Sequence, residues 1–250
     1  MNIKMIVTDL DGTLLRTDKT ISERTKATLS QCKESGVKMV YATARGGSAE
    51  RILPAGIFDG KVIRGGAIAK IGDEIVYSRL IPHQIIRPIL IVCDKRGLRI
   101  TSETADIKYA NYGDNISDFS QYDIDAEMVY FEGLTPDDEV FIKSQLPESL
   151  YFMAMSDTSI DANGGSFGMI IHKEATKTKA VSELARLWNI TLSEIIAFGD
   201  DVNDTELLRN CGISVAVANA IDEVKAAADY IGDTNDNDGV AKWIEERILK

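Results

Sequence analysis

Two aspartates, two positions apart, follow the first apolar segment of the chain. The sequence Asp-Leu-Asp-Gly-Thr-Leu occupies residues 9–14, directly after the expected strand Ile3–Thr8. Side chains alternate along a strand, so Asp9 and Asp11 are expected to point to the same side, and Gly12 permits a tight turn. Two neighbouring carboxylates repel each other unless a cation or a proton lies between them. An acidic turn that bonds only its own backbone is the simpler alternative.

A second acidic cluster, Gly-Asp-Asp-Val-Asn-Asp, occupies residues 199–204 and also follows an apolar segment. By itself it could be an acidic helix start. Ligands of open α/β sheets bind beyond the carboxyl ends of the strands, so two such clusters indicate one shared cation. The chain has only two histidines, and its three cysteines are far apart. Carboxylates would therefore be the ligands, which favours a hard ion such as Mg²⁺.

The elements that must position these residues alternate between strands and helices at both ends of the chain. Strands are expected at 3–8, 37–42, 62–63, 194–198, 213–217 and 230–231, and helices at 22–33, 176–188, 204–209, 221–228 and 239–249. This alternation is typical of a parallel sheet with crossover helices, and so of an α/β fold.

The middle of the chain has a different pattern. A hairpin is expected over 67–80 around Gly72-Asp73, followed by a helix that Pro88 interrupts. Short strands near 98–101, 128–131, 151–154 and 169–172 surround a helix that begins near Pro136. This α+β region is inserted between the two α/β segments.

Composition limits the partners and the location. The 250 residues carry a formal charge of −11, with 44% hydrophobic residues. An acidic soluble protein of this kind argues against nucleic acid and anionic membranes as partners. No apolar stretch approaches the roughly 20 residues of a membrane span, and the first residues do not resemble a signal peptide. With its scattered cysteines, the chain is expected to be cytoplasmic.

These motifs together resemble the haloacid dehalogenase (HAD) superfamily phosphatases of the Cof type with a C2-type cap. The family's Asp-x-Asp-Gly-Thr motif matches residues 9–13, and its Gly-Asp-x-x-Asn-Asp motif matches residues 199–204. Its Thr after the second strand matches Thr43, and its Lys near a helix start matches Lys177. The sequences Val-Ala-Asn-Ala at 217–220 and Asp-Gly-Val-Ala at 238–241 also resemble the Cof pattern.

The resemblance implies a Rossmann-like core of residues 1–82 and 173–250 and a cap of residues 83–172 that closes over the site and selects the substrate. It implies Asp9 as nucleophile and Asp11 as general acid and base. The other implied catalytic residues are Thr43 and Lys177. The implied Mg²⁺ ligands are Asp9, Asp11 through its backbone carbonyl, Asp200 and Asp204; the implied phosphate-binding residues are Gly12, Thr43, Ala44, Arg45, Lys177 and Asn203.

The resemblance further implies a Mg²⁺-dependent phosphatase that forms an aspartyl phosphate and acts on small phosphorylated metabolites, especially sugar phosphates. A phosphomutase or phosphotransferase on the same core, or a non-catalytic phosphate-binding module, remains the alternative. Arg45 is expected to pair with the substrate phosphate, a carboxylate of the cap or a structural partner. Oligomeric state and the preferred substrate cannot be predicted.

Other signals have simpler explanations. Gly-Gly-Ser-Phe-Gly at 164–168 imitates a serine-hydrolase motif, but we expect a glycine-rich turn. The acidic segment 233–238 imitates a calcium loop, but we expect a solvated loop. His83 and His172 fall near the predicted crossings between core and cap, where surface or packing roles are expected.

Overall fold

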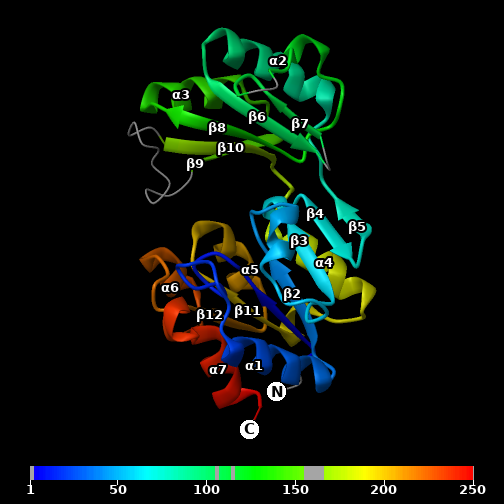
Figure 1. Cartoon of the computed structure of the whole chain (residues 1–250), viewed down its shortest axis with the longest axis vertical. Coiled ribbons are helices and arrows are strands. Elements are labelled where there is room, and N and C mark those ends of the chain that lie inside the picture. Colours follow the sequence, from blue (N-terminus) through cyan, green and yellow to red (C-terminus); the bar gives the residue numbers. More distant parts are fainter. Residues whose placement is uncertain (1–2, 105–106, 114–115, 155–165, 250) are drawn as a thin grey trace. The chain divides into compact units, whose positions relative to one another are not determined.

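A computed structural model describes residues 3–104, 107–113, 116–154 and 166–249. The chain divides into two compact units (Figure 1). The core unit contains residues 1–78 and 176–250, and the inserted unit contains residues 79–175.

An eight-stranded sheet forms the centre of the core unit, in the order β13-β12-β11-β1-β2-β3-β4-β5. The strands from β13 to β3 are parallel, and β4 and β5 form an antiparallel hairpin at one edge. The strands are β1 (Met5–Thr8), β2 (Lys38–Ala42), β3 (Gly60–Ile63), β4 (Ile68–Ile71), β5 (Glu74–Ser78), β11 (Ile195–Gly199), β12 (Ile213–Ala216) and β13 (Tyr230–Ile231). The predicted α/β architecture is confirmed.

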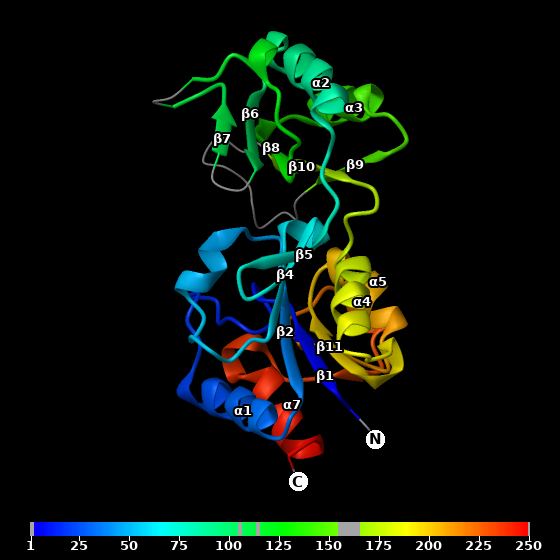
Figure 2. The same ribbon diagram turned by 90° about the vertical axis from the view of Figure 1, so that its right-hand side faces the viewer.

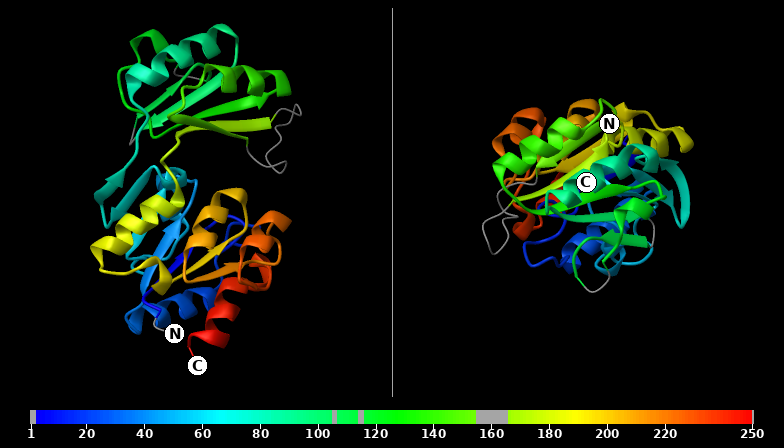
Figure 3. Two further views of the ribbon diagram at one scale, coloured as in Figure 1. Left: turned by 180° about the vertical axis from the view of Figure 1, so that it is seen from behind. Right: turned by 90° about the horizontal axis from the view of Figure 1, so that it is seen from above.

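Helices cover both faces of this sheet. The helices α1 (Glu23–Glu34) and α7 (Gly239–Arg247) pack together on one face, whereas α4 (Lys177–Leu187) and α5 (Thr205–Asn210) lie on the other (Figure 2). The view from behind in Figure 3 shows α4 lying across the strands of the β3–β5 edge. The short helix α6 (Asp222–Ala227) packs against α5 and β12.

The central strands explain why the acidic motifs meet. Every side chain of β1 and of β11 is buried, which accounts for their unbroken apolar sequences. The two strands pair in parallel, with Thr8 opposite Phe198. Their carboxyl ends therefore lie at the same edge of the sheet, immediately before Asp9 and Asp200.

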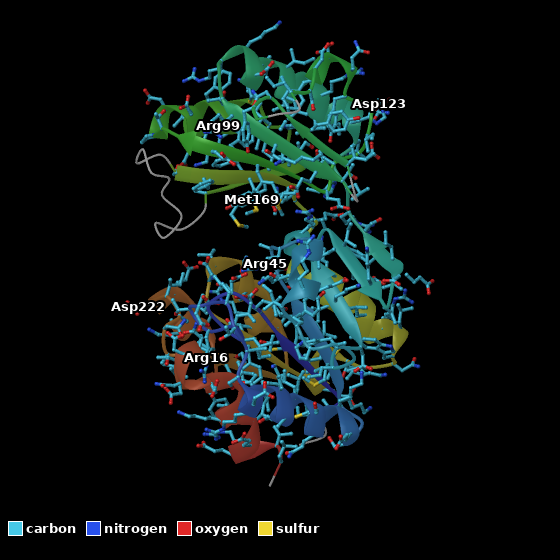
Figure 4. The ribbon with its side chains drawn as sticks, viewed as in Figure 1. Arg16, Arg45, Arg99, Asp123, Met169 and Asp222 are labelled. Atoms are coloured by element: carbon cyan, nitrogen blue, oxygen red, sulfur yellow. The ribbon has the colours of Figure 1, made fainter. Side chains whose placement is uncertain are left out.

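The inserted unit has its own antiparallel sheet, in the order β7-β6-β8-β10-β9. Its strands and helices are α2 (His83–Lys95), β6 (Arg99–Thr104), β7 (Ile107–Ala110), β8 (Met128–Leu134), α3 (Pro136–Gln145), β9 (Leu150–Ala154) and β10 (Ser166–His172). An apolar cluster that includes Leu90, Phe131 and Ile142 fills the space between this sheet and its two helices. Met169 lies on the sheet face that these helices leave uncovered (Figure 4).

Several local expectations were wrong. Pro88 does not interrupt α2, which continues through it, and β7 was not predicted. Ser166 and Gly168 belong to β10 rather than to a turn, and Gly164 and Gly165 lie outside the described residues. None of the helices in the described ranges has the length and apolarity that crossing a bilayer requires.

Candidate active site

Three adjacent strands of the core sheet end at one edge, and a polar side chain follows each of them. The strands β1, β2 and β11 are parallel neighbours, and the Asp9 N–H still donates to the Phe198 carbonyl at 3.0 Å. Asp9, Thr43 and Asp200 therefore leave the sheet together, at the edge where open α/β sheets bind ligands.

Lys177 connects two of the predicted site carboxylates inside the protein. Its Nζ donates to Asp9 Oδ1 at 2.6 Å and to Asp204 Oδ1 at 2.7 Å, and the lysine side chain is completely buried. Burial alone lowers the pKa of a lysine, but the Asp204 and Asp9 carboxylates outweigh it and raise the pKa of Lys177 above its ordinary value. Burial also raises the pKa of Asp9 well above its usual range, although Lys177 opposes this shift. One ammonium group thus serves two carboxylates.

The position of Lys177 depends on a close contact of its helix with a turn. Lys177 is the first residue of α4, where a positive charge opposes the helix dipole. The turn η2 (Arg64–Gly66) lies against this helix start: Gly66 has φ +108°, and a β carbon there would lie 2.2 Å from the Thr176 carbonyl carbon. Glycine at this position therefore permits the contact that places Lys177 at Asp9.

Asp200 is held by the loop that follows Asp9. Thr13 Oγ1 donates to Asp200 Oδ1 at 2.5 Å. Burial raises the pKa of Asp200 to about 7, although the Thr13 hydrogen bond opposes the shift. Gly12 has φ +80°, and a β carbon there would lie 2.2 Å from Asp200 Oδ2. Gly12 is thus required both by its backbone conformation and by the space that Asp200 occupies.

Asp204 and Asp201 have different functions within the second acidic cluster. Asp204 Oδ2 accepts the backbone N–H groups of Asp200 at 3.1 Å and of Asp201 at 3.3 Å, while its other oxygen accepts Lys177. Asp201 Oδ1 instead accepts the N–H of Val202 and caps the short helix η6 (Val202–Asp204). Both residues therefore belong to a capping box, and Asp204 also binds Lys177.

The carboxylates of Asp9, Asp200 and Asp204 form a group that fits a divalent cation. One oxygen of each lies within 4.8 Å of the other two. When all three carboxylates are ionised, a single ammonium cannot neutralise them, and a second cation would compensate the remaining charge. Asn203 Oδ1 is buried and has no hydrogen-bond partner among the described residues, and this neutral oxygen belongs to the residue that precedes Asp204. Such oxygen donors suit a hard cation such as Mg²⁺.

The Asp11 carboxylate lies outside this group and is engaged by two basic side chains. Arg45 donates through Nε to Oδ2 and through Nη2 to Oδ1 at 2.6 Å, and Lys19 Nζ donates to Oδ1 at 2.8 Å. Burial alone raises the pKa of Asp11, but the hydrogen bonds from Arg45 and Lys19 lower it below the ordinary value. Among the described residues, the carboxylate that pairs with Arg45 therefore belongs to the core unit.

Thr43 and Ala44 link Arg45 to the end of β2. Thr43 is almost fully buried, and its Oγ1 accepts the Arg45 N–H at 3.1 Å. Its carbonyl also accepts the N–H of Gly65 from the η2 turn. Figure 4 shows Arg45 projecting at this edge of the core unit.

Sequence reasoning missed four residues around this site. Three of them, Thr13, Lys19 and Asn219, bond to Asp200, Asp11 and Gly12 respectively. The fourth, Arg64, is 9% exposed and has φ +54°, and a β carbon at Gly46 would lie 2.4 Å from its guanidinium carbon. The Asp-x-Asp-Gly-Thr motif could have indicated Thr13 as a site residue. No sequence pattern indicates the left-handed backbone conformation of Arg64.

The prediction of a solvated loop at 233–238 holds for Asp236 and Asn237, which are exposed, but not for the whole segment. Asn235 is 5% exposed and donates to the Leu15 carbonyl. Asp236 accepts from Thr17, and Asp238 accepts from Arg16. The segment is therefore hydrogen-bonded to the loop that follows Asp9.

Ser166 and the two histidines, for which we expected no catalytic role, lie in the inserted unit. Ser166 donates to Glu139 at 3.2 Å. His83 contacts Asp125 Oδ1 through its ring Nδ1 at 2.8 Å. His172 Nδ1 accepts the N–H of Glu174. These contacts account for both histidines as local structural groups.

Known proteins are similar in sequence to nearly the whole of this chain. Residues 6–244 match the family model described as haloacid dehalogenase-like hydrolase. The chain is 28% identical over 257 residues to the 5-amino-6-(5-phospho-D-ribitylamino)uracil phosphatase YcsE of Bacillus subtilis, covering 100% of this chain and 97% of that protein. It is 29% identical over 283 residues to the phosphatase YbjI of Escherichia coli, which has the same substrate in its name, with coverage of 100% and 97%.

The fold comparison gives the same result. The structure of the HAD subclass IIB sugar phosphatase BT4131 superposes with a TM-score of 0.82 at 24% identity, covering 97% of this chain and 98% of that one. At this level of identity the superposition shows a shared fold.

Proposed function

Since this chain belongs to the haloacid dehalogenase-like hydrolase family and is a phosphoric monoester hydrolase, we propose that it is a Mg²⁺-dependent phosphatase of small phosphorylated metabolites. Sugar phosphates are the proposed preferred class. The inserted unit serves as the cap that selects among them.

The observation that carries this proposal is the buried contact of Lys177 with Asp9 beside Asp200 and Asp204. A carboxylate becomes a useful nucleophile toward a phosphate dianion only if the surrounding charge is compensated. Lys177 supplies one positive charge. Asp9, Asp200, Asp204 and the Asp11 backbone carbonyl would hold a Mg²⁺ ion, which would further compensate the charge of the phosphoryl oxygens.

In the proposed first step, an Asp9 oxygen forms a bond to phosphorus while the bond to the ester oxygen breaks. The leaving alkoxide takes a proton from the Asp11 carboxyl group, which for this step must be protonated and so released from Arg45 and Lys19. In the second step, water attacks the aspartyl phosphate and gives its proton to the Asp11 carboxylate. Inorganic phosphate then leaves, and Asp9 is regenerated.

The remaining residues position the phosphoryl group. The Thr43 hydroxyl and the Ala44 backbone, at the end of β2, bind its oxygens, together with Gly12, Asn203 and Lys177. Arg45, which is bound to Asp11 in this structure, offers a fork of donors that suits a phosphate. A bound phosphate would therefore compete with Asp11 for this arginine.

The names of the relatives support the substrate class. YcsE and YbjI are named for a phosphorylated ribityl compound, and BT4131 is a sugar phosphatase. The phosphorylated ribityl compound and the sugar phosphates are both small phosphate esters with a polyhydroxylated carbon chain.

A screen of phosphorylated metabolites tests the proposal, with inorganic phosphate measured in Mg²⁺ and in EDTA. We expect phosphate release from small sugar phosphates in Mg²⁺, abolished by Asp9→Asn and retained in Asp222→Asn, which changes an exposed aspartate on α6. Turnover by Asp9→Asn would refute the nucleophile assignment. Transfer to a second hydroxyl without phosphate release would instead indicate a phosphotransferase.

A further inference from the structure

One Cof-like motif takes no part in the mechanism above, yet it contacts the site. Asn219, in the segment that follows β12, donates through Nδ2 to the Gly12 carbonyl at 2.7 Å. Its Oδ1 accepts the backbone N–H of Asn235 at 2.9 Å. Both ends of the Asn219 amide are therefore engaged, which fixes the orientation of the side chain.

The Gly12 carbonyl belongs to the peptide group that leads directly into Thr13. The Thr13 hydroxyl donates to Asp200 Oδ1 at 2.5 Å, and Gly12 itself lies against the other Asp200 oxygen. Fixing this peptide group fixes the direction from which Thr13 reaches Asp200. Three hydrogen bonds and the Gly12–Thr13 peptide group thus form a continuous path from Asn235 through Asn219 to Asp200.

We propose that Asn219 is a positioning residue for the cation site, acting through the Gly12–Thr13 peptide group and the Thr13 hydroxyl on the Asp200 carboxylate. The inference rests on the proposed Mg²⁺-dependent function of that site. Partners that orient metal-binding carboxylates commonly change metal affinity by about 10- to 100-fold when they are removed.

The backbone at the Asn235 end of this path is closely packed. Asn235 is 5% exposed and also donates through Nδ2 to the Leu15 carbonyl at 2.9 Å. The Ala218 N–H donates to the Asp233 carbonyl, and a β carbon at Gly239 would lie 2.1 Å from that same oxygen. The backbone that carries Asn219 and Asn235 is therefore closely packed.

The second bond of Asn235 provides a matched control. In both bonds a side-chain amide N–H donates to a backbone carbonyl of the loop after Asp9. The acceptor of the Asn235 bond is the Leu15 carbonyl, whereas that of the Asn219 bond is the Gly12 carbonyl next to Thr13. Asn235→Ala removes this bond and keeps the backbone N–H that Asn219 accepts. A merely structural role for Asn219 predicts equal effects of Asn219→Ala and Asn235→Ala.

The test is the Mg²⁺ dissociation constant of the folded full-length protein, measured by isothermal titration calorimetry without substrate. We expect Asn219→Ala to weaken Mg²⁺ binding by about 10-fold or more, and Asn235→Ala by less than about 2-fold at a comparable loss of Tm. Because Asn219 is proposed to act through Thr13, adding Asn219→Ala to Thr13→Val should weaken binding by less than about 2-fold further. If Asn219→Ala does not fold, Asn219→Ser takes its place.

An unchanged Mg²⁺ dissociation constant in Asn219→Ala, equal weakening in Asn235→Ala, or independent effects of Asn219→Ala and Thr13→Val would each overturn the inference. Failure of the wild type to bind Mg²⁺ would instead refute the proposed cation dependence. The positioning role would then be decided by the crystal structure of Asn219→Ala, where an unchanged contact between Thr13 Oγ1 and Asp200 Oδ1 overturns it.

Discussion

The ammonium group of Lys177 lies 2.6 Å from the Asp9 carboxylate, although 168 positions separate the two residues in the sequence. The lysine side chain is completely buried, and that of Asp9 is 9% exposed. A charged group in such a place is stable only with its partners, because removing one leaves the other uncompensated in a medium of low polarity. The contact is therefore part of the fold as well as of the proposed chemistry.

Replacing this lysine should consequently destabilise the core unit and abolish activity. Lys177→Met keeps the length of the side chain and removes the charge, leaving Asp9 and Asp204 buried together. Loss of one partner of a buried ion pair costs about 3–5 kcal/mol of unfolding free energy. Urea unfolding checks this value, with Lys179→Met on the exposed face of the same helix as control. Equal stability of the two variants would contradict the buried pair.

Gly12→Ala should do more damage than an alanine at another left-handed glycine. Gly12 has φ +80° and Gly36 has φ +88°, but a β carbon at Gly12 would collide with Asp200, whereas one at Gly36 meets no atom within 4 Å. Gly36→Ala should therefore cost only the backbone strain, about 1–2 kcal/mol. Gly12→Ala should cost more and lower kcat as well. Equal unfolding free energies with normal kcat in Gly12→Ala would show that Asp200 does not occupy this space.

Mg²⁺ should raise the Tm of the wild type, because a ligand that binds only the folded state stabilises it. Asp200→Asn should reduce this rise, whereas Asp201→Asn, which alters only the cap of η6, should retain it. Differential scanning fluorimetry with increasing Mg²⁺ measures both. A full Mg²⁺ response in Asp200→Asn would exclude Asp200 from the cation site.

Without Mg²⁺, Asp200→Asn should raise the Tm rather than lower it. A carboxyl group whose pKa is raised to about 7 in the folded state destabilises the protein once the pH exceeds its unfolded-state pKa of about 3.9, and the cost is complete above pH 7. In EDTA at pH 8, Asp200→Asn is therefore expected to have a higher Tm than the wild type, and this difference should shrink as the pH falls toward 4. A constant difference across that range would contradict the raised pKa.

The surface pair of Lys4 and Glu194 should contribute to the loss of stability of the core unit in acid. Lys4 lies 2.7 Å from Glu194, and its hydrogen bond, with help from the Thr191 N–H, lowers the pKa of Glu194 to about 2. A lowered carboxyl pKa stabilises the fold above the unfolded-state value of about 4.3, and the contribution is lost as the pH falls toward 2. Glu194→Gln should thus lower the urea midpoint at pH 7 and converge with the wild type between pH 4.5 and 2. Glu223→Gln, at an exposed position of α6, should show no such convergence.

The sequence alone predicted the structure correctly where local residue patterns determine it. The apolar segments before Asp9 and Asp200 predicted two parallel strands, and their carboxyl ends do meet at one edge of the sheet. Ser22 was expected to begin a helix, and it caps α1 by accepting the Thr25 N–H. These features depend on residue type and neighbouring positions, which a single sequence contains.

The pairing of charges could not be predicted in this way. Arg45 was expected to face a substrate, a cap carboxylate or a structural partner, and in the structure it pairs with Asp11. Asn235 looked like part of a solvated acidic loop, because its partner Leu15 is 220 positions away. The strand β7 was missed because two of its four side chains are exposed and its alternation is weak. Each of these outcomes depends on tertiary neighbours.

The pairing of β1 with β11 also has a consequence for protein synthesis. Asp9 is synthesised before the inserted unit, whereas Lys177 and β11, the sheet neighbour of its strand, are synthesised after it. That unit has an apolar core of its own, as a domain that folds as a unit has. The nascent protein therefore contains Asp9, the proposed nucleophile, before it contains the lysine and the strand that hold Asp9 in the folded protein.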